Sequence, residues 1–219
     1  MLNIYKYHDD REDLMVTDTS YSKFIQGHSM SNDFFKKRWP SAEKYIIKNA
    51  ASSLKYAQDG IKGRWPEAEP VIMKDPGYAY TYARFVIRGR WEEAEPVIMK
   101  DAQYAYDYAR DVIKGRFKEA EPYIITDVQI AYDYARIVIK GRFKEAEPVI
   151  MKYPYWALSY AYNIIKGRWS EAEGVIMKEP WHAYNYAKDI IKGRWEEAEK
   201  YIMKDNRYWD MYKKEFGVK

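Results

Sequence analysis

Seven aromatic residues recur at an unbroken spacing of 26 residues. They are Trp39, Trp65, Trp91, Phe117, Phe143, Trp169 and Trp195. A period of about 20–50 residues is typical of repeat arrays, in which each unit buries its apolar face only by stacking on its neighbours. The chain of 219 residues is therefore expected to form one array of repeats rather than an ordinary globular domain.

Each copy is expected to hold two helices, for example over residues 91–100 and 102–114. The recurring Asp75, Asp101, Asp127 and Asp205, with Asn49 in the first copy, occupy the position of an N-cap before the second helix. A proline follows at the first helical position in three copies, where its missing N–H costs nothing. These are Pro76, Pro154 and Pro180.

Glycine and proline also recur near the ends of the expected helices. Recurring glycines are expected to end each second helix in the left-handed conformation. They are Gly63, Gly89, Gly115, Gly141, Gly167 and Gly193. Prolines at the sixth position of the first helix predict a kink or a late start there, because proline lacks a donor and crowds the preceding turn. They are Pro70, Pro96, Pro122 and Pro148.

The pattern predicts an all-α fold, an α-solenoid of about seven short helix-pair repeats with N- and C-terminal caps. The boundaries are a partly irregular N-terminal cap over 1–37, repeats over 38–205 and a C-terminal capping helix over 206–219. The last segment departs from the repeat, because Lys213 and Gly217 stand where other copies have Ala and Ile. The handedness of the array stays open.

Two charged residues are invariant among the copies. An arginine precedes each recurring aromatic residue, and a glutamate follows four residues after it. On a helix this glutamate lies toward the apolar side, where an unpaired carboxylate is costly. We expect each glutamate to pair, in bidentate geometry, with an arginine of its own or a neighbouring copy. A row of ligand-binding charges is the less favoured alternative.

Composition excludes several kinds of chemistry. Without cysteine there is no disulfide, thiolate metal site or cysteine nucleophile, and the absence suits a reducing cytoplasm. The histidines are His8, His28 and His182, and none has partners at metal-ligand spacing. No phosphate-binding loop or nucleophile elbow occurs. No apolar run is long enough to span a bilayer, and the first residues lack the basic-then-apolar pattern of a signal peptide. We expect a cytoplasmic, non-enzymatic protein with no metal, cofactor, catalytic residue or membrane partner.

Basic residues recur in two rows. One row comprises Lys62, Arg88, Lys114, Lys140, Lys166 and Lys192. The other comprises Lys48, Lys74, Lys100, Lys152, Lys178 and Lys204, interrupted by Thr126. Such rows suit a phosphate backbone, so nucleic acid is an alternative partner. Because the net charge is only +4, cations that complement helix dipoles are the favoured interpretation.

The copies differ most at the turn into the second helix and on the exposed face of that helix, and later copies carry aromatic residues at the turn. They are Tyr153, Tyr155, Trp156, Trp181, His182, Tyr208 and Trp209. Exposed aromatic residues on successive turns suit a protein partner, since Tyr and Trp dominate binding hot spots. The alternative is that they only pack over the C-terminal end of the array.

The phrase Lys-Gly-Arg-Trp-x-Glu-Ala-Glu-Pro-x-Ile-Met-Lys-Asp, followed by Tyr-Ala-Tyr-x-Tyr-Ala-Arg, resembles tandem-repeat proteins encoded mostly by bacteriophages and of unknown function. The resemblance covers about residues 35–212. It implies a viral accessory protein in the bacterial cytoplasm and supplies no catalytic residues. The helix-pair design also resembles tetratricopeptide arrays, whose repeats are longer.

The most favoured function is binding a protein through the array surface, with a host protein, such as a defence protein, as the partner that the resemblance implies. The alternatives are nucleic-acid binding through the lysine rows and self-assembly into a structural array.

Overall fold

The computed structural model describes residue 38 and residues 40–219. The expected N-terminal cap over 1–37, with His8 and His28, lies outside the described residues, as does Trp39. The chain divides into two compact units, one up to Lys100 and one from Asp101, and each is described by itself. The described residues are all-helical, without a strand, so the predicted α-solenoid class is confirmed.

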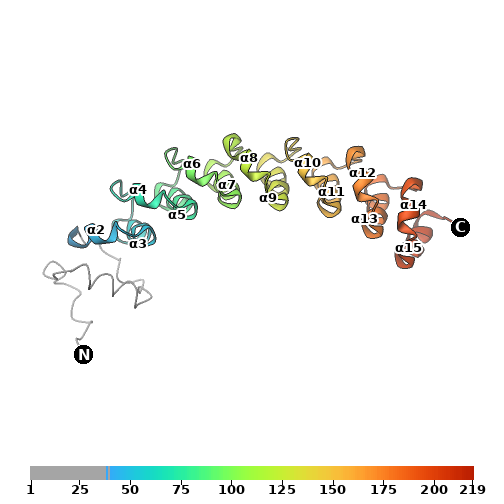
Figure 1. Ribbon diagram of the computed structural model, residues 1–219, viewed down its shortest axis with the longest axis horizontal. Helices are drawn as coiled ribbons and strands as arrows, with labels where there is room; N and C mark the ends of the chain where they lie inside the picture. Colours follow the sequence, from blue (N-terminus) through green and yellow to red (C-terminus); the bar gives the residue numbers. More distant parts are fainter. Residues whose placement is uncertain (1–37, 39) are drawn as a thin grey trace, which may run out of the picture. The chain divides into compact units, whose positions relative to one another are not determined.

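The first unit alternates short and longer helices (Figure 1). Its helices are α2 (Pro40–Ile46), α3 (Ala50–Tyr56), α4 (Glu69–Ile72), α5 (Pro76–Tyr82) and α6 (Glu95–Ile98). Two π-helical turns, η3 (Ala57–Ile61) and η4 (Ala83–Ile87), extend α3 and α5. Helix α3 packs against both α4 and α5, so this second helix contacts both helices of the next copy.

The second unit repeats the alternation. Its α-helices are α7 (Ala102–Tyr108), α8 (Glu121–Ile124), α9 (Val128–Asp133), α10 (Glu147–Ile150), α11 (Pro154–Tyr160), α12 (Ser170–Ile176), α13 (Pro180–Asn185), α14 (Glu196–Ile202) and α15 (Asn206–Phe216). The π-helical turns are η5 (Ala109–Ile113), η7 (Tyr134–Ile139), η8 (Ala161–Ile165) and η9 (Tyr186–Ile191), and η6 (Lys118–Ala120) is a 3-10 turn.

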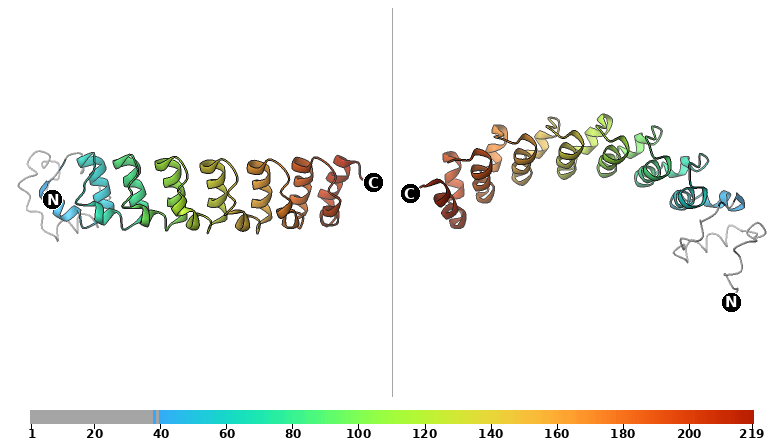
Figure 2. Two further views of the ribbon diagram at one scale, coloured as in Figure 1. Left: turned by 90° about the horizontal axis from the view of Figure 1, so that it is seen from above. Right: turned by 180° about the vertical axis from the view of Figure 1, so that it is seen from behind.

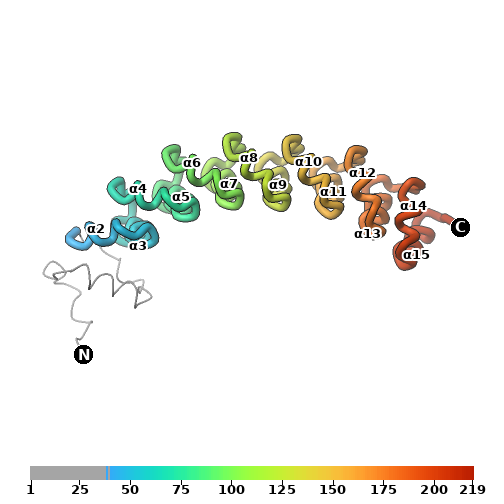
Figure 3. The backbone as a smooth tube through the Cα atoms, viewed as in Figure 1, coloured from blue at the N-terminus to red at the C-terminus, as the bar shows by residue number. Residues whose placement is uncertain are grey.

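The second helices of this unit form a layer in which neighbours pack side by side, α7 on α9, α9 on α11, α11 on α13 and α13 on α15 (Figure 2). The first helices α8, α10, α12 and α14 form a second layer beside it (Figure 3). A helix pair of this kind cannot enclose its own apolar residues, so burial comes from the neighbouring copy.

The core is built from the repeated aromatic residues and alanines. Tyr134 and Ala135 are completely buried, as are Phe143 and Ala146 of the next copy. The rings of Tyr134 and Phe143 lie 5.5 Å apart at an interplanar angle of 51°, so the aromatic contact joins one copy to the next. A fully buried aromatic side chain contributes about 2–3 kcal/mol, which makes this repeated contact a main source of stability.

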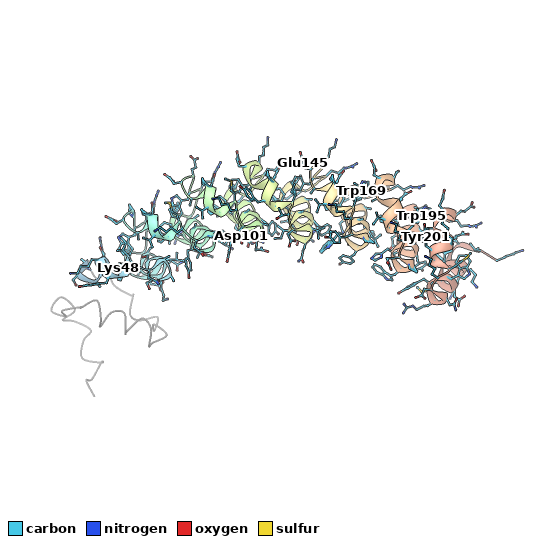
Figure 4. All side chains as sticks on the ribbon, viewed as in Figure 1. Lys48, Asp101, Glu145, Trp169, Trp195 and Tyr201 are labelled. Atoms are coloured by element: carbon cyan, nitrogen blue, oxygen red, sulfur yellow. The ribbon has the colours of Figure 1, made fainter. Side chains whose placement is uncertain are left out.

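The predicted N-caps are confirmed. The Asp101 carboxylate, labelled in Figure 4, accepts the backbone N–H of Tyr104 at 3.0 Å, and Asp75 accepts that of Tyr78 at 2.9 Å. Asn49 caps α3 in the same way through the N–H of Ser52. These bonds satisfy N–H groups that have no partner within the helix.

The predicted late start of the first helix is also confirmed. The four copies with proline at its sixth position have helices of four residues, beginning at the residue before the proline. The three copies with Lys44, Gly174 or Lys200 at that position have helices of seven residues. Proline withholds one backbone hydrogen bond, and the chain ahead of it forms turns instead.

The predicted left-handed glycines are wrong. The left-handed residue is the cation before each glycine, with φ between 57° and 60° in six copies, and none of the six glycines has a positive φ. In the second unit, for example, the N–H groups of Lys114 and Gly115 both bond to the carbonyl oxygen of Ala109. This wider π turn makes the chain reverse one residue before the glycine.

The last helix, α15, shows what happens without that turn. It runs as a continuous α-helix of 11 residues and ends at Gly217, whose φ is 65°. Gly217 lies five residues after the buried Tyr212, whereas Lys192 lies six residues after Tyr186. The π turn therefore adds one residue to each earlier second helix, and it places a cation where α15 has glycine.

Candidate functional site

The invariant arginines and glutamates form ion pairs within one copy. The Arg116 guanidinium donates to both Glu121 oxygens at 2.8 Å, and Arg142 donates to both Glu147 oxygens at 2.7 and 2.8 Å. Glu121 is only 8% exposed, whereas the arginine side chain is 40% exposed. The expected pairing is confirmed, with the partner coming from the same copy.

A tyrosine of the second helix completes this network. The Tyr134 hydroxyl donates to Glu121 at 3.2 Å and accepts the backbone N–H of Phe117 at 2.7 Å. Tyr160 makes the same two contacts with Glu147 and Phe143. The network thus ties the turn before each first helix to the second helix of the same copy.

The network keeps its tyrosines neutral. Burial, together with Glu173 beside the hydroxyl, raises the pKa of Tyr186 to about 12, and the hydrogen bond from the backbone N–H of Trp169 acts in the opposite direction. The pKa values of Tyr134 and Tyr160 are raised for the same reasons. A neutral phenol that donates to a carboxylate suits a structural hydrogen bond, so we assign this repeated cluster to the stability of the fold.

The lysine row predicted for phosphate binding lies on the surface. In the second unit Lys114, Lys140, Lys166 and Lys192 are exposed, and each is the left-handed residue at the end of a π turn. In the first unit Lys62 and Arg88 hold the same position. These cations lie at the negative ends of helix dipoles, which supports the favoured interpretation.

Four of the aromatic residues predicted for partner binding come together on α11 and α13. Tyr155 contacts Trp156 with ring centroids 5.0 Å apart, and Trp181 contacts His182 at 4.8 Å. Tyr155 and His182, 6.5 Å apart, join the two pairs across the neighbouring helices. Tyr132 of α9 lies 5.2 Å from Trp156 and extends the chain of rings to a third helix.

The chain of rings is open to solvent at two places. Tyr155 is 53% exposed and Trp181 is 41% exposed, whereas Trp156 and His182 are half-buried beneath them. Tyr153, the residue before α11, is also exposed. Aromatic residues that are held by neighbouring rings and still half exposed have little conformational entropy left to lose when a partner covers them.

The other two predicted residues take a different place. Tyr208 stacks on Tyr184 with ring centroids 6.4 Å apart, and Trp209 stacks on the buried Tyr212 at 5.6 Å. Both are only partly exposed. They pack over the C-terminal end of the array, as the alternative interpretation proposed.

Sequence reasoning missed Tyr162, whose 57% exposure is the largest among the exposed large apolar side chains of the described residues. It lies seven residues after Tyr155, so both face the same side of α11 and η8. Arg110, Arg136 and Lys188 hold its position in other copies of this unit. The replacement of a recurring cation by tyrosine was the signal for it.

The two tyrosines belong to a stretch without charge. Residues 153–165 contain no acidic or basic residue, whereas the corresponding residues of α7 with η5 include Asp107, Arg110 and Asp111. We call Tyr155, Trp156, Tyr162, Trp181 and His182 the aromatic surface. In this part of the second unit, exposed aromatic rings occur together with a stretch that has no charged residue.

His182 is the titratable member of the aromatic surface. Its Nδ1 is buried without a hydrogen-bond partner. Burial lowers the pKa of this imidazole, and the nearby Glu179 acts in the opposite direction. The histidine is thus held neutral as part of the ring cluster.

Comparisons with protein-family models, curated proteins and solved structures find no match for this chain. Among the described residues, no group of three or more His, Asp or Glu side chains is arranged to hold a metal ion. Across the same residues, the helices are too short and too polar to cross a membrane.

Proposed function

We propose that the protein is a non-enzymatic binding module that engages a protein partner through the aromatic surface of α11 and α13. The observation that carries the proposal is the uncharged stretch 153–165 with Tyr155 and Tyr162 exposed on one side. Exposed, clustered aromatic residues without charge are unusual on a monomer and typical of the centre of a binding interface.

The fold itself does not require these side chains. Gln103 and Gln129 hold the position of Tyr155 in α7 and α9, and Arg110 and Arg136 hold that of Tyr162. Those copies keep the same buried tyrosines and alanines. The aromatic surface is therefore dispensable for packing, which supports a role in recognition.

The test is an affinity pull-down from bacterial lysate, with and without nuclease. The full chain is compared with a triple variant, Tyr155→Gln, Tyr162→Arg and Trp181→Gln. These changes copy Gln129 of α9 and Arg136 of η7 onto the equivalent positions of α11, η8 and α13. Tyr123→Val is the matched control, because Tyr123 is an exposed tyrosine on α8 and Val149 holds its place in α10.

A protein that survives nuclease, is retained by the control and is lost from the triple variant is the expected result. Equal capture by all three chains would overturn the proposal. The phage resemblance makes a bacterial host protein, such as a defence protein, the partner to look for in this lysate. Mass that rises with concentration and falls in the triple variant would instead identify a second copy as the partner.

Nucleic-acid binding is the second candidate, favoured by the exposed lysine row. It predicts an affinity that falls steeply with salt, because each phosphate contact releases counterions. Recovery of nucleic acid alone, unchanged in the triple variant, would replace the first proposal with this one.

A further inference from the structure

The aromatic surface has a border of lysines. Lys152 and Lys166 lie at the two ends of α11 with η8, and Lys178 and Lys192 lie at the two ends of α13 with η9. Lys188, in η9, holds the position that Tyr162 has in η8, and these two turns pack together. All five side chains are exposed.

Few carboxylates balance this border. Glu179 and Asp189 are the acidic residues over 152–166 and 178–192, against the five lysines. The matching segments of the two preceding copies, 100–114 and 126–140, hold five carboxylates and five cations. The field over the aromatic surface is therefore positive, whereas that over α7 and α9 is nearly neutral.

The carboxylates of α7 and α9 pair with arginines on the same face. Arg110 lies 2.8 Å from Asp107 and 2.7 Å from Asp111, and Arg136 lies 2.9 Å from Asp133. In α11 the equivalent positions carry Ser159 and Asn163, and no acidic residue remains. The five lysines of the border take no part in the ion pairs of the described residues.

We infer that the partner of the aromatic surface is an acidic peptide segment, with an apolar or aromatic anchor that covers Tyr155, Tyr162 and Trp181 and carboxylates that meet the lysine border. The inference rests on the proposed function and adds the chemistry of the partner. The anchor supplies affinity by burying ring area, and the charges steer the encounter and select against basic segments.

The experiment selects binders from a displayed random-peptide library on the immobilised full chain. The triple variant Tyr155→Gln, Tyr162→Arg and Trp181→Gln serves for counter-selection. Synthetic copies of the enriched peptides are then titrated against a lysine variant, Lys152→Gln, Lys166→Asn and Lys188→Gln. Asparagine is chosen at 166 because it tolerates the left-handed conformation.

A matched control removes three cations elsewhere in the second unit, Lys114→Asn, Lys118→Gln and Lys144→Gln. Circular dichroism of every variant checks that the helical content is unchanged. Peptide affinity is measured at low salt and again at about 1 M salt, where the Debye length shrinks to about 3 Å.

Enriched peptides with Asp or Glu around an apolar or aromatic residue are expected. Their affinity should fall about tenfold in the lysine variant at low salt, much less at high salt, and little in the control. Basic or uncharged enriched peptides, or equal affinity for the lysine variant and the control, would overturn the inference and leave the proposed function intact.

Two other outcomes would bear on the proposed function or on the class of partner. No enrichment over the triple variant would contradict the proposed function together with the inference. Binding of a single-stranded homopolymer oligonucleotide that is lost in the lysine variant but kept in the triple variant would assign the border to nucleic acid and overturn the acidic-peptide inference.

Discussion

Helices α7 and α9 and helices α11 and α13 share one interior and differ on their outer face. In both pairs a buried tyrosine, such as Tyr134 or Tyr160, bonds to the glutamate of its copy. On the outside, α7 and α9 with their π turns carry paired Asp and Arg residues, whereas α11 and α13 carry a chain of aromatic rings. The repeated interior maintains the fold, so the divergent exterior is where a specific function is to be sought.

The largest effect on the shared interior is expected at alkaline pH. The network tyrosines have pKa values raised above 10, to about 12 for Tyr186, because burial disfavours the phenolate. Because the pKa of each network tyrosine is higher in the folded than in the unfolded chain, the neutral phenols stabilise the fold fully below pH 10. This contribution to stability is lost as the pH rises through the folded pKa. We expect the phenolate absorbance of the buried tyrosines to rise together with the loss of helix between about pH 10 and 12. Ionisation of every tyrosine, buried ones included, near pH 10 with the helices intact would contradict the buried network.

Removing one carboxylate of the network tests whether the two regions are equivalent. Glu121→Ala and Glu147→Ala each leave a tyrosine hydroxyl and an arginine without their acceptor, and each should cost about 2 kcal/mol. The melting temperature is expected to fall by about 5 °C in both variants. The exposed Glu119→Ala is the control, with little change. A small effect equal to that of the control would refute the buried pair, and unequal effects would show that the interiors differ.

The first helices offer a contrast of their own. Pro148→Lys copies the residue found at Lys200 and should extend α10 toward the seven residues of α14. Hydrogen exchange of the amides around residue 148 is the measurement, with Lys200→Pro as the reverse change. The stability should change by less than about 1 kcal/mol, because the hydrogen bond gained is offset by the greater freedom of the unfolded chain. An unchanged exchange pattern would show that proline does not set the helix start.

The smallest effect is expected on the charged outer face. Asp133→Ser gives α9 the residue that α11 has at Ser159 and removes the 2.9 Å pair with Arg136, whose side chain is 49% exposed. Such a pair is worth about 0.5 kcal/mol or less. Chemical denaturation of the variant should therefore overlay that of the parent chain. A loss above about 1 kcal/mol would mean that the outer charges also maintain the fold.

Much of the fold could be predicted because its signals are local. An Asp such as Asp101 caps the helix that begins at the next residue, and Pro148 acts on its own turn. The pairing of Glu121 with Arg116 was predicted from the cost of a lone carboxylate near an apolar face. The left-handed glycines were predicted wrongly, because a π turn that widens a helix by one residue has no local sequence signal.

Part of the candidate site was predicted in the same way. The uneven aromatic residues pointed to Tyr155, Trp156, Trp181 and His182, and the structure joins them in one chain of rings. It separates Tyr208 and Trp209 from them, because those rings stack on Tyr184 and Tyr212. Tyr162 was missed because the predicted aromatic residues cluster at the start of the second helix, whereas Tyr162 lies near its other end, in η8.

By itself the sequence determined the period, the helix pairs, their caps and the glutamate that must find a cation, since each depends on residues a few positions apart. Only the tertiary structure decided that Tyr134, 13 residues after Glu121, completes the network, and that Tyr155 and His182 meet across two helices. Contacts between different helices depend on how neighbouring copies pack. A π turn that adds one residue to a helix also shifts the position of the residues that follow it.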